Sequence, residues 1–463
     1  MGIWRTYSNR RVCRNLFGKR RKSFRRINRH YLKQLKLFSF IIMDSGLIGF
    51  VIFVAITGLI VYLKRDKIER QGIILMMRTK KFKQDIKKHA IKHRKFWNIY
   101  FNIGICVSFL AMFFGIWYLM NNTINIASGI GSSGFALVLP FPTSSFSFQP
   151  GLFLVPIWYW LIAIIILIFP HELSHAFALS INKLRIKSLG LILFLFIPGA
   201  FVEPDEKQLK KASKFKRLQV FCAGSFSNIV TALFFILILN IFLSVAYTPA
   251  GIYYSFPAEK INKTEIIEIN NLTNGIMELK TENNTYLLTK TLFKEQKNKT
   301  EIIVFQDWPA VRNNLSGAIK KIDNYWINTP KDVSFILSKH KPNDTILIET
   351  TKGIYNITLA ENNGKPFLGI VTSYDPILDF IAPMNYRDYE VKNRNFEKIG
   401  EFLLKLISFI IAVCFGVAIV NILPIKPLDG GLVLETLTNR KIANFISLII
   451  FVLIIYNFVG PFI

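Results

Sequence analysis

Five consecutive residues carry the strongest chemical signal in this chain: His171-Glu172-Leu173-Ser174-His175. Residues at positions i and i+4 of a helix lie on the same face, so both imidazoles can reach one zinc ion while Glu172 lies beside the water bound there. The segment interrupts the end of an apolar run, where an ionisable side chain costs roughly 3 kcal/mol unless it is paired or binds a metal. We therefore predict a zinc site with His171 and His175 as ligands.

Two imidazoles leave a catalytic zinc short of a third protein ligand. The other conspicuous acid within the apolar part of the chain is Asp429, at the end of the segment Asn421-Ile422-Leu423-Pro424-Ile425-Lys426-Pro427-Leu428-Asp429. Both apolar runs that lead to these residues are expected to cross the membrane in the same direction, so Asp429 should reach a similar depth to His171 and His175. Taken alone, Pro-Leu-Asp-Gly-Gly is typical of a turn that ends a helix.

A second histidine pair and the cysteines are not predicted to bind metal. His89 and His93 have the same spacing, but they lie among five basic residues, so a divalent cation would be repelled. The chain's four cysteines are scattered without the spacing of a metal site: Cys13, Cys106, Cys222 and Cys414.

The elements that must position these residues are membrane helices. The 463 residues are 51% hydrophobic and 19% charged, and the apolar residues lie in blocks, which indicates a multi-pass α-helical membrane protein. The net charge of +29 arises from basic residues that flank these blocks, which is typical of cytoplasmic loops and argues against nucleic-acid binding. Six runs are long enough to cross the hydrocarbon core: 44–63, 98–120, 152–180, 218–246, 400–423 and 442–463.

Basic loops predict the orientation of these spans. Segments 64–97 and 207–217 are rich in Lys and Arg and should be cytoplasmic, which places 121–150 and 247–399 outside. Eight glycosylation sequons lie in these two outer segments, in agreement with that orientation. The segment 188–202 is too short and too interrupted by Gly and Pro for a full span, so we expect a re-entrant hairpin there.

The sequence predicts five consecutive segments along the chain. Residues 1–42 form a basic segment that either precedes a true start at Met43 or is a disordered tail near acidic lipid. The predicted N-terminal membrane domain covers 43–249, and a polar β-rich domain covers 250–375. A linker at 376–399 and a C-terminal membrane segment at 400–463 complete the predicted order.

These residues together resemble the site-2 protease family of intramembrane zinc proteases, most closely archaeal members with an inserted PDZ-like domain. The resemblance covers most of 44–463 and rests on the His-Glu-x-x-His helix, the later Asn-x-x-Pro-x-x-Pro-Leu-Asp-Gly element and the order of spans. It implies that His171, His175 and Asp429 bind Zn²⁺, that Glu172 is the general base, and that Asn421 helps to hold an unwound substrate strand.

The resemblance also implies a function and a setting. It implies cleavage of peptide bonds within or near transmembrane helices of membrane-protein substrates, with the active site toward the cytoplasmic side of the cell membrane. Segments from Trp308-Pro309-Ala310 to Leu368-Gly369-Ile370 resemble an α+β PDZ-like domain outside the membrane, a module that captures extended peptides. Residues 253–298 match no PDZ element.

Two residues depart from the expected pattern, and three other functions stay open. Pro170 removes a backbone donor just before the first ligand, and Lys426 puts a cation near the proposed zinc. A non-catalytic membrane adaptor or chaperone of the same fold would bind zinc without cleaving substrates. A transporter also carries ionisable residues in its spans, although no inverted repeat is visible. A zinc protease that takes Glu as its third ligand would not need Asp429.

Overall fold

The computed structural model describes residues 46–128, 133–143, 145–149, 151–272, 275–297, 299–372 and 376–462. The predicted basic segment 1–42 and the alternative start at Met43 lie outside these residues. The chain divides into two compact units. We call Met1–Phe234 with Phe409–Ile463 the membrane unit and Phe235–Ser408 the insert unit.

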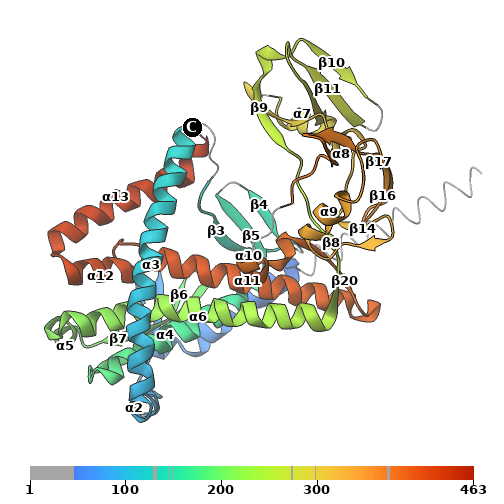
Figure 1. Ribbon diagram of the computed structural model, residues 1–463. Helices are drawn as coiled ribbons and strands as arrows, with labels where there is room; N and C mark the ends of the chain where they lie inside the picture. Colours follow the sequence, from blue (N-terminus) through green and yellow to red (C-terminus); the bar gives the residue numbers. More distant parts are fainter. Residues whose placement is uncertain are drawn as a thin grey trace, which may run out of the picture. The chain divides into compact units, whose positions relative to one another are not determined.

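Six helices in the described ranges are long and apolar enough to cross a membrane, and each of the six predicted runs lies on one of them (Figure 1). The bounds differ most in two places: residues 152–156, which we predicted to begin a span, form strand β5 (Leu152–Pro156), and the helix predicted to end at 120 continues to Ala127. The six helices are Gly46–Leu63, α3 (Arg94–Ala127), α4 (Ile157–Ile181), α6 (Lys214–Ala246), α11 (Glu397–Ile422) and α13 (Arg440–Val459).

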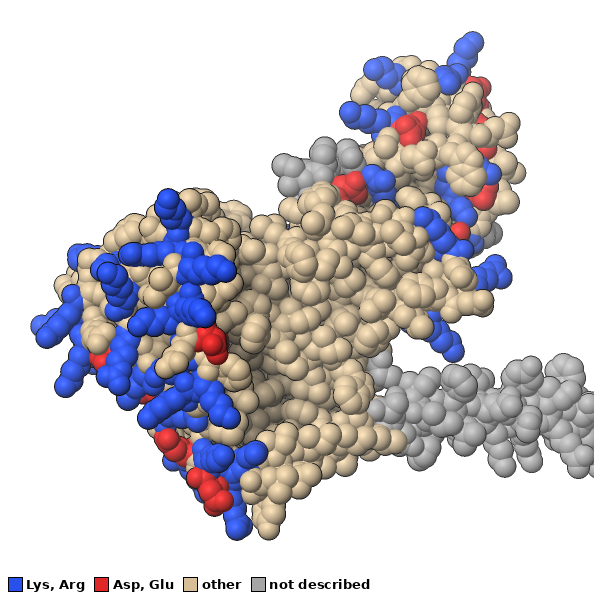
Figure 2. Space-filling view, turned by 90° about the horizontal axis from the view of Figure 1, so that it is seen from below, with Lys and Arg blue, Asp and Glu red and all other residues tan. Residues whose placement is uncertain are grey.

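Apolar side chains cover both the inside and the outside of the membrane unit. Phe101, Phe177 and Phe221 belong to a buried cluster where α3, α4 and α6 meet. Large apolar residues such as Leu110 and Phe445 are more than 60% exposed, as expected of helices that face lipid rather than water. Figure 2 shows Lys and Arg side chains gathered at one end of this unit, next to a broad surface without charges.

Residues 188–202 form a β-hairpin. Strands β6 (Ile186–Phe194) and β7 (Ile197–Pro204) pair antiparallel, and β6 also pairs with β2 (Ile74–Thr79), which pairs with β1 (Ile68–Gln71). The sequence predicted the turn but not the strands, and it assigned 68–79 to a loop. Four strands therefore share one sheet in the order β1-β2-β6-β7, and β7 packs on α4.

Shorter elements complete the membrane unit. Strand β5 pairs in parallel with β3 (Leu137–Phe141) and antiparallel with β4 (Ser147–Gln149). Helices α2 (Lys83–Lys92), α5 (Glu206–Lys211) and α12 (Asp429–Leu437) connect the longer helices.

The insert unit contains two large sheets and one two-stranded sheet. Residues 253–298, which match no PDZ element, supply most of a five-stranded antiparallel sheet in the order β10-β11-β12-β13-β9. Its elements are β9 (Ala258–Asn262), β10 (Glu268–Asn271), β11 (Ile276–Lys280), β12 (Thr285–Thr289), α7 (Lys290–Glu295) and β13 (Glu301–Gln306).

The second sheet has the order β17-β16-β14-β8-β20, with β15 paired to β14. Its outermost strand, β20 (Arg387–Val391), lies in the segment 376–399 that we predicted to be a linker, so this segment is part of the folded insert unit. The other strands of this sheet are β8 (Tyr247–Ile252), β14 (Ile319–Ile322), β15 (Tyr325–Trp326), β16 (Thr345–Thr350) and β17 (Ile354–Thr358). Strands β18 (Ala360–Asn362) and β19 (Lys365–Phe367) pair with each other in a separate two-stranded sheet. The helices of the unit include α8 (Pro309–Arg312), α9 (Pro330–Leu337) and α10 (Pro376–Ile381).

Candidate metal centre

Helix α4 presents the two predicted histidine ligands side by side. Pro170 lies inside this helix without ending it, so the residues on either side belong to one continuous element. One helical turn separates His171 from His175, and their Nε2 atoms are 3.3 Å apart. Two imidazole nitrogens that converge in this way repel one another unless a proton or a cation lies between them.

Asp429 completes the convergence from the other end of the chain. Its Oδ2 atom lies 3.6 Å from Nε2 of His171 and 3.3 Å from Nε2 of His175. Ligands about 2.0 Å from a tetrahedrally coordinated zinc are separated by roughly 3.3 Å from one another. The three atoms thus have the spacing of one zinc coordination sphere, and they form the only group of three or more such ligands found among the described residues.

The glycines after Asp429 explain how the carboxylate reaches this position. Asp429 is the first residue of α12, and the chain between α11 and α12 folds back tightly. A Cβ atom at Gly430 would lie 1.9 Å from the carbonyl oxygen of Ile422, and one at Gly431 would lie 2.5 Å from the carbonyl carbon of Ile425. Only glycine fits at both positions, so the Asp-Gly-Gly sequence is a geometric requirement of this turn.

Both imidazoles are oriented by groups on helix α6. Nδ1 of His175 lies 2.8 Å from the carbonyl oxygen of Val220, to which it can donate its proton, leaving Nε2 free to bind a metal. Nδ1 of His171 lies 3.0 Å from the amide nitrogen of Asn228, whose Oδ1 is buried without a hydrogen-bond partner. Turning this amide by 180° makes Oδ1 the acceptor for an Nδ1 proton, which is the arrangement that a metal-binding imidazole requires.

Gly224 leaves the space in which the ligand atoms meet. A Cβ atom at this position of α6 would lie 2.4 Å from Cε1 of His171 and 2.5 Å from Nε2 of both histidines. No side chain larger than hydrogen fits there unless the imidazoles move. Gly224 and Asn228 therefore belong to the candidate site although the sequence analysis did not select them. The available signal was a small and polar segment, Gly224-Ser225-Phe226-Ser227-Asn228, inside an apolar span.

Asn421 lies within the site, at the end of α11. Its side-chain amide donates a hydrogen bond to Oδ2 of Asp429 at 2.8 Å and lies 3.4 Å from Nε2 of His171. Lys426, which the sequence placed near the zinc, instead pairs with Glu435 and donates to Oδ1 of Asn444 at 2.9 Å. Its charge is therefore compensated away from the three ligand atoms.

Glu172 lies between the ligand-bearing helix and the neighbouring sheet. The backbone N–H of Val202 in β7 donates a hydrogen bond to the Glu172 carboxylate. This contact links the candidate base to the β6–β7 hairpin, which the sequence analysis treated as a separate feature.

The donor set fits a catalytic zinc. Two imidazoles and one carboxylate are typical protein ligands of catalytic zinc sites, which keep a further position for water or substrate. The space kept by Gly224 and the acceptors for both Nδ1 atoms agree with such a site. His89 and His93, which have the same spacing, are arranged differently. The ring of His89 stacks on Phe177 with 5.6 Å between centroids, and its centroid is 4.9 Å from that of His93.

Comparisons with known proteins relate this chain to a family of peptidases. The model of peptidase family M50 matches residues 159–457. A membrane-bound transcription factor site-2 protease homolog of Arabidopsis thaliana is 29% identical over 107 residues, which are 22% of this chain and 21% of that protein. An uncharacterised protein of Methanocaldococcus jannaschii is 29% identical over 196 residues, 41% of this chain and 49% of that protein. The matches thus span about a fifth and about half of these relatives.

Proposed function

Because the chain belongs to peptidase family M50, the site-2 protease family, we propose that it hydrolyses peptide bonds within or near transmembrane helices of membrane-protein substrates. The observation that carries this proposal is the convergence of His171, His175 and Asp429 at the ends of apolar helices. A hydrolytic site on such helices can reach peptide bonds that the bilayer hides from soluble proteases.

Each residue of the site has a proposed role. A zinc ion held by His171, His175 and Asp429 supplies Lewis acidity, which activates water at neutral pH and polarises the peptide carbonyl. Glu172 accepts the proton of the attacking water, and its hydrogen bond from the backbone of Val202 holds the carboxylate in position. Asn421 orients Asp429, and we also assign to its amide a part in holding the substrate strand.

The substrate must be locally unwound. A helical peptide bond has its carbonyl engaged in the hydrogen-bond ladder of its own helix, so attack requires that this bond first be opened. We therefore expect single-span membrane proteins with weakened helices as substrates. Nucleic acid has no role in this reaction, and the lipid bilayer is the medium in which substrate and site meet.

We also propose an orientation in the membrane. The first turn of α6 carries Lys214, Lys216 and Arg217, and basic side chains gather at one end of the membrane unit (Figure 2). The positive-inside rule places this end in the cytoplasm, with the catalytic site toward the same side and the insert unit outside.

The insert unit is proposed to act on substrates before cleavage. Residues 308–371 supply strands of the six-stranded sheet and helix α9, whose Val333 and Ile336 are buried in a core shared with Ile346 and Ile348. A PDZ-like domain of this kind would hold an extended substrate end by adding it as a strand to a sheet edge.

The proposed function is tested with the full-length protein in liposomes that contain a model transmembrane substrate. We expect the wild type to bind one zinc per chain and to cleave. Glu172→Gln should keep the zinc and lose cleavage, since it removes the base but no ligand. Zinc binding by a wild-type protein that cleaves no unstable transmembrane helix would instead indicate an adaptor or chaperone, and cleavage by Glu172→Gln would contradict the assigned base.

A further inference from the structure

Three exposed aromatic side chains and two lysines gather at one place on the insert unit. Tyr325, Trp326 and Phe335 are 50%, 60% and 62% exposed. The ammonium groups of Lys321 and Lys339 lie over their rings. We call these five residues the aromatic–lysine patch. Large aromatic side chains grouped on a surface are typical of interaction sites, because their exposure to water is otherwise unfavourable.

The patch covers both faces of a hairpin. Strands β14 and β15 pair Lys321 with Trp326 and Ile322 with Tyr325, so Trp326 and Tyr325 point to opposite faces. On one face Nζ of Lys321 lies 4.2 Å from the centroid of the Trp326 ring. On the other face Nζ of Lys339, which follows the end of helix α9, lies 4.6 Å from the Tyr325 centroid and 4.3 Å from the centroid of Phe335 in α9. Each face thus combines an aromatic ring with an ammonium group.

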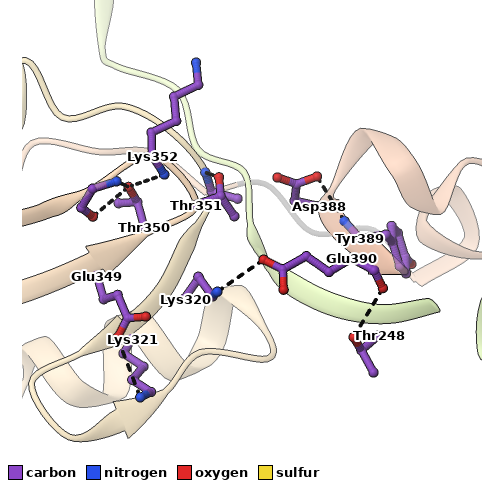
Figure 3. A network of polar contacts seen from close by, with 12 residues as sticks. Thr248, Lys320, Lys321, Glu349, Thr350, Thr351, Lys352, Asp388, Tyr389 and Glu390 are labelled. Atoms are coloured by element: carbon purple, nitrogen blue, oxygen red, sulfur yellow. Dashed lines mark hydrogen bonds and ion pairs between the residues drawn. The ribbon is translucent and has the colours of Figure 1, made fainter. Parts of the chain in front are cut away.

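Carboxylates near the patch are already engaged. Glu349 lies 3.6 Å from Nζ of Lys321, as drawn in Figure 3. Oδ1 of Asp323, in the hairpin turn, accepts a hydrogen bond from the backbone N–H of Leu347, and its Oδ2 lies 3.2 Å from Nε2 of His340. Among the residues that the structure describes, no carboxylate lies within salt-bridge distance of Lys339. The ammonium group of Lys339 is therefore the charge of the patch that stays available to an anionic partner.

The register of the sheet places this hairpin beside the end of a membrane helix. Strand β8 begins at Tyr247, directly after α6 ends at Ala246. Strand β14 pairs antiparallel with β8 at Ile319 and Ile252, so it runs back toward Tyr247.

A side-chain contact agrees with this direction. Nζ of Lys320 lies 3.2 Å from Oε1 of Glu390, and Glu390 is opposite Thr248 in the pairing of β20 with β8 (Figure 3). Val245, in the last turn of α6, is apolar and 70% exposed, as expected of a residue that still faces lipid. The β14–β15 hairpin thus lies toward the end of β8 that directly follows α6.

We propose that the aromatic–lysine patch docks on the surface of the lipid bilayer, with its rings at headgroup level and its lysines on the phosphates of anionic lipids. Trp and Tyr are enriched at this depth because their rings have an apolar body and a polar edge. Lysine adds attraction to anionic lipid, about a fivefold gain in docking per residue. A bilayer fits better than a peptide groove because aromatic rings with ammonium groups over them occur on both faces of the hairpin. Docking ties the insert unit to the membrane independently of any proteolytic role.

The docking is tested by the depth of the hairpin turn in the full-length protein in liposomes. An environment-sensitive dye is attached through Asn324→Cys, after Cys13 and Cys106 are replaced by serine. A matched dye on Asn283→Cys, in the exposed turn between β11 and β12, reports a second exposed turn of the insert unit outside the patch. We expect spin labels at the lipid headgroups to quench the dye at 324 several-fold more strongly than the dye at 283.

Further variants separate the contribution of the aromatic rings from that of the lysines. Trp326→Ser combined with Phe335→Ser should reduce quenching at 324 to the level seen at 283. Ile354→Ser, at a 69% exposed apolar residue of β17 outside the patch, should leave it unchanged. Phosphatidylglycerol in phosphatidylcholine liposomes should increase quenching, and Lys321→Gln with Lys339→Gln should remove that increase. Equal quenching at both turns overturns the proposal. A response at 324 that requires added substrate protein rather than lipid also overturns it, in favour of a protein partner.

Discussion

Gly224→Ala should abolish tight metal binding without unfolding the protein. The added Cβ atom would lie 2.4 Å from Cε1 of His171 and 2.5 Å from Nε2 of both histidines. Ordinary contact needs about 3.4 Å or more, so the rings must move by roughly 1 Å, whereas coordination distances tolerate only about 0.2 Å. Movement of the two imidazole rings is opposed by their Nδ1 contacts with Val220 and Asn228, which lie on the same helix as Gly224.

The expected loss of zinc affinity follows from this geometry. Loss of a group that merely orients a ligand costs about 10-fold to 100-fold in metal affinity, so displacement of two ligands should cost at least 100-fold. The assay is zinc competition against a chelator of known affinity, together with thermal unfolding of the metal-free protein. Gly416→Ala on α11 is the matched control, because no atom lies within 4 Å of its added Cβ. Unchanged zinc affinity in Gly224→Ala would falsify the assignment of the ligand atoms.

Three further predictions concern groups around the site and the packing of the helices. Asn228→Ala should weaken zinc binding about 10-fold to 100-fold, since His171 loses its Nδ1 partner, and chelator competition measures this. Asn457→Leu should lower the free energy of unfolding in detergent by about 1 kcal/mol, because the buried Asn457 amide donates to Thr123 of α3 at 2.7 Å; an unchanged midpoint would refute this. Hydrogen bonds from Lys187 and Ser188, with the charges of Lys187 and Arg78, lower the pKa of Glu203. Its contribution to hairpin stability is present above the ordinary carboxyl pKa and lost as pH falls through the lowered value. As pH falls through the lowered pKa of Glu203, hydrogen-exchange protection of β6 and β7 should decrease in the wild type but not in Glu203→Gln.

The membrane helices and the placement of His171 beside His175 on one helical face could be predicted from local sequence alone. An apolar run of sufficient length can satisfy its backbone in lipid only as a helix, so each of the six runs lies on a helix. Likewise, the spacing of His171 and His175 places both on one helical face whatever lies around them. These features depend on neighbours along the chain.

The rest depends on contacts between distant segments. Strand β2 pairs with β6 more than a hundred residues later, and β20 pairs with β8 across the whole insert unit, so neither pairing has a local signal. Asn228 was visible as a polar residue in a span, but its partner could be identified only once α6 was packed on α4. The predicted depth of Asp429 was a topological inference, whereas its contact with both histidines depends on the tight turn at Gly430.

The most direct test of the metal centre is X-ray absorption at the zinc edge, measured on the purified full-length protein and on Asp429→Ala. We expect one zinc per wild-type chain, with two imidazole ligands and oxygen at about 2.0–2.2 Å. Asp429→Ala should lose the zinc or show a changed first coordination shell. A wild-type protein without stoichiometric zinc, or a spectrum that is the same in Asp429→Ala, would contradict this prediction.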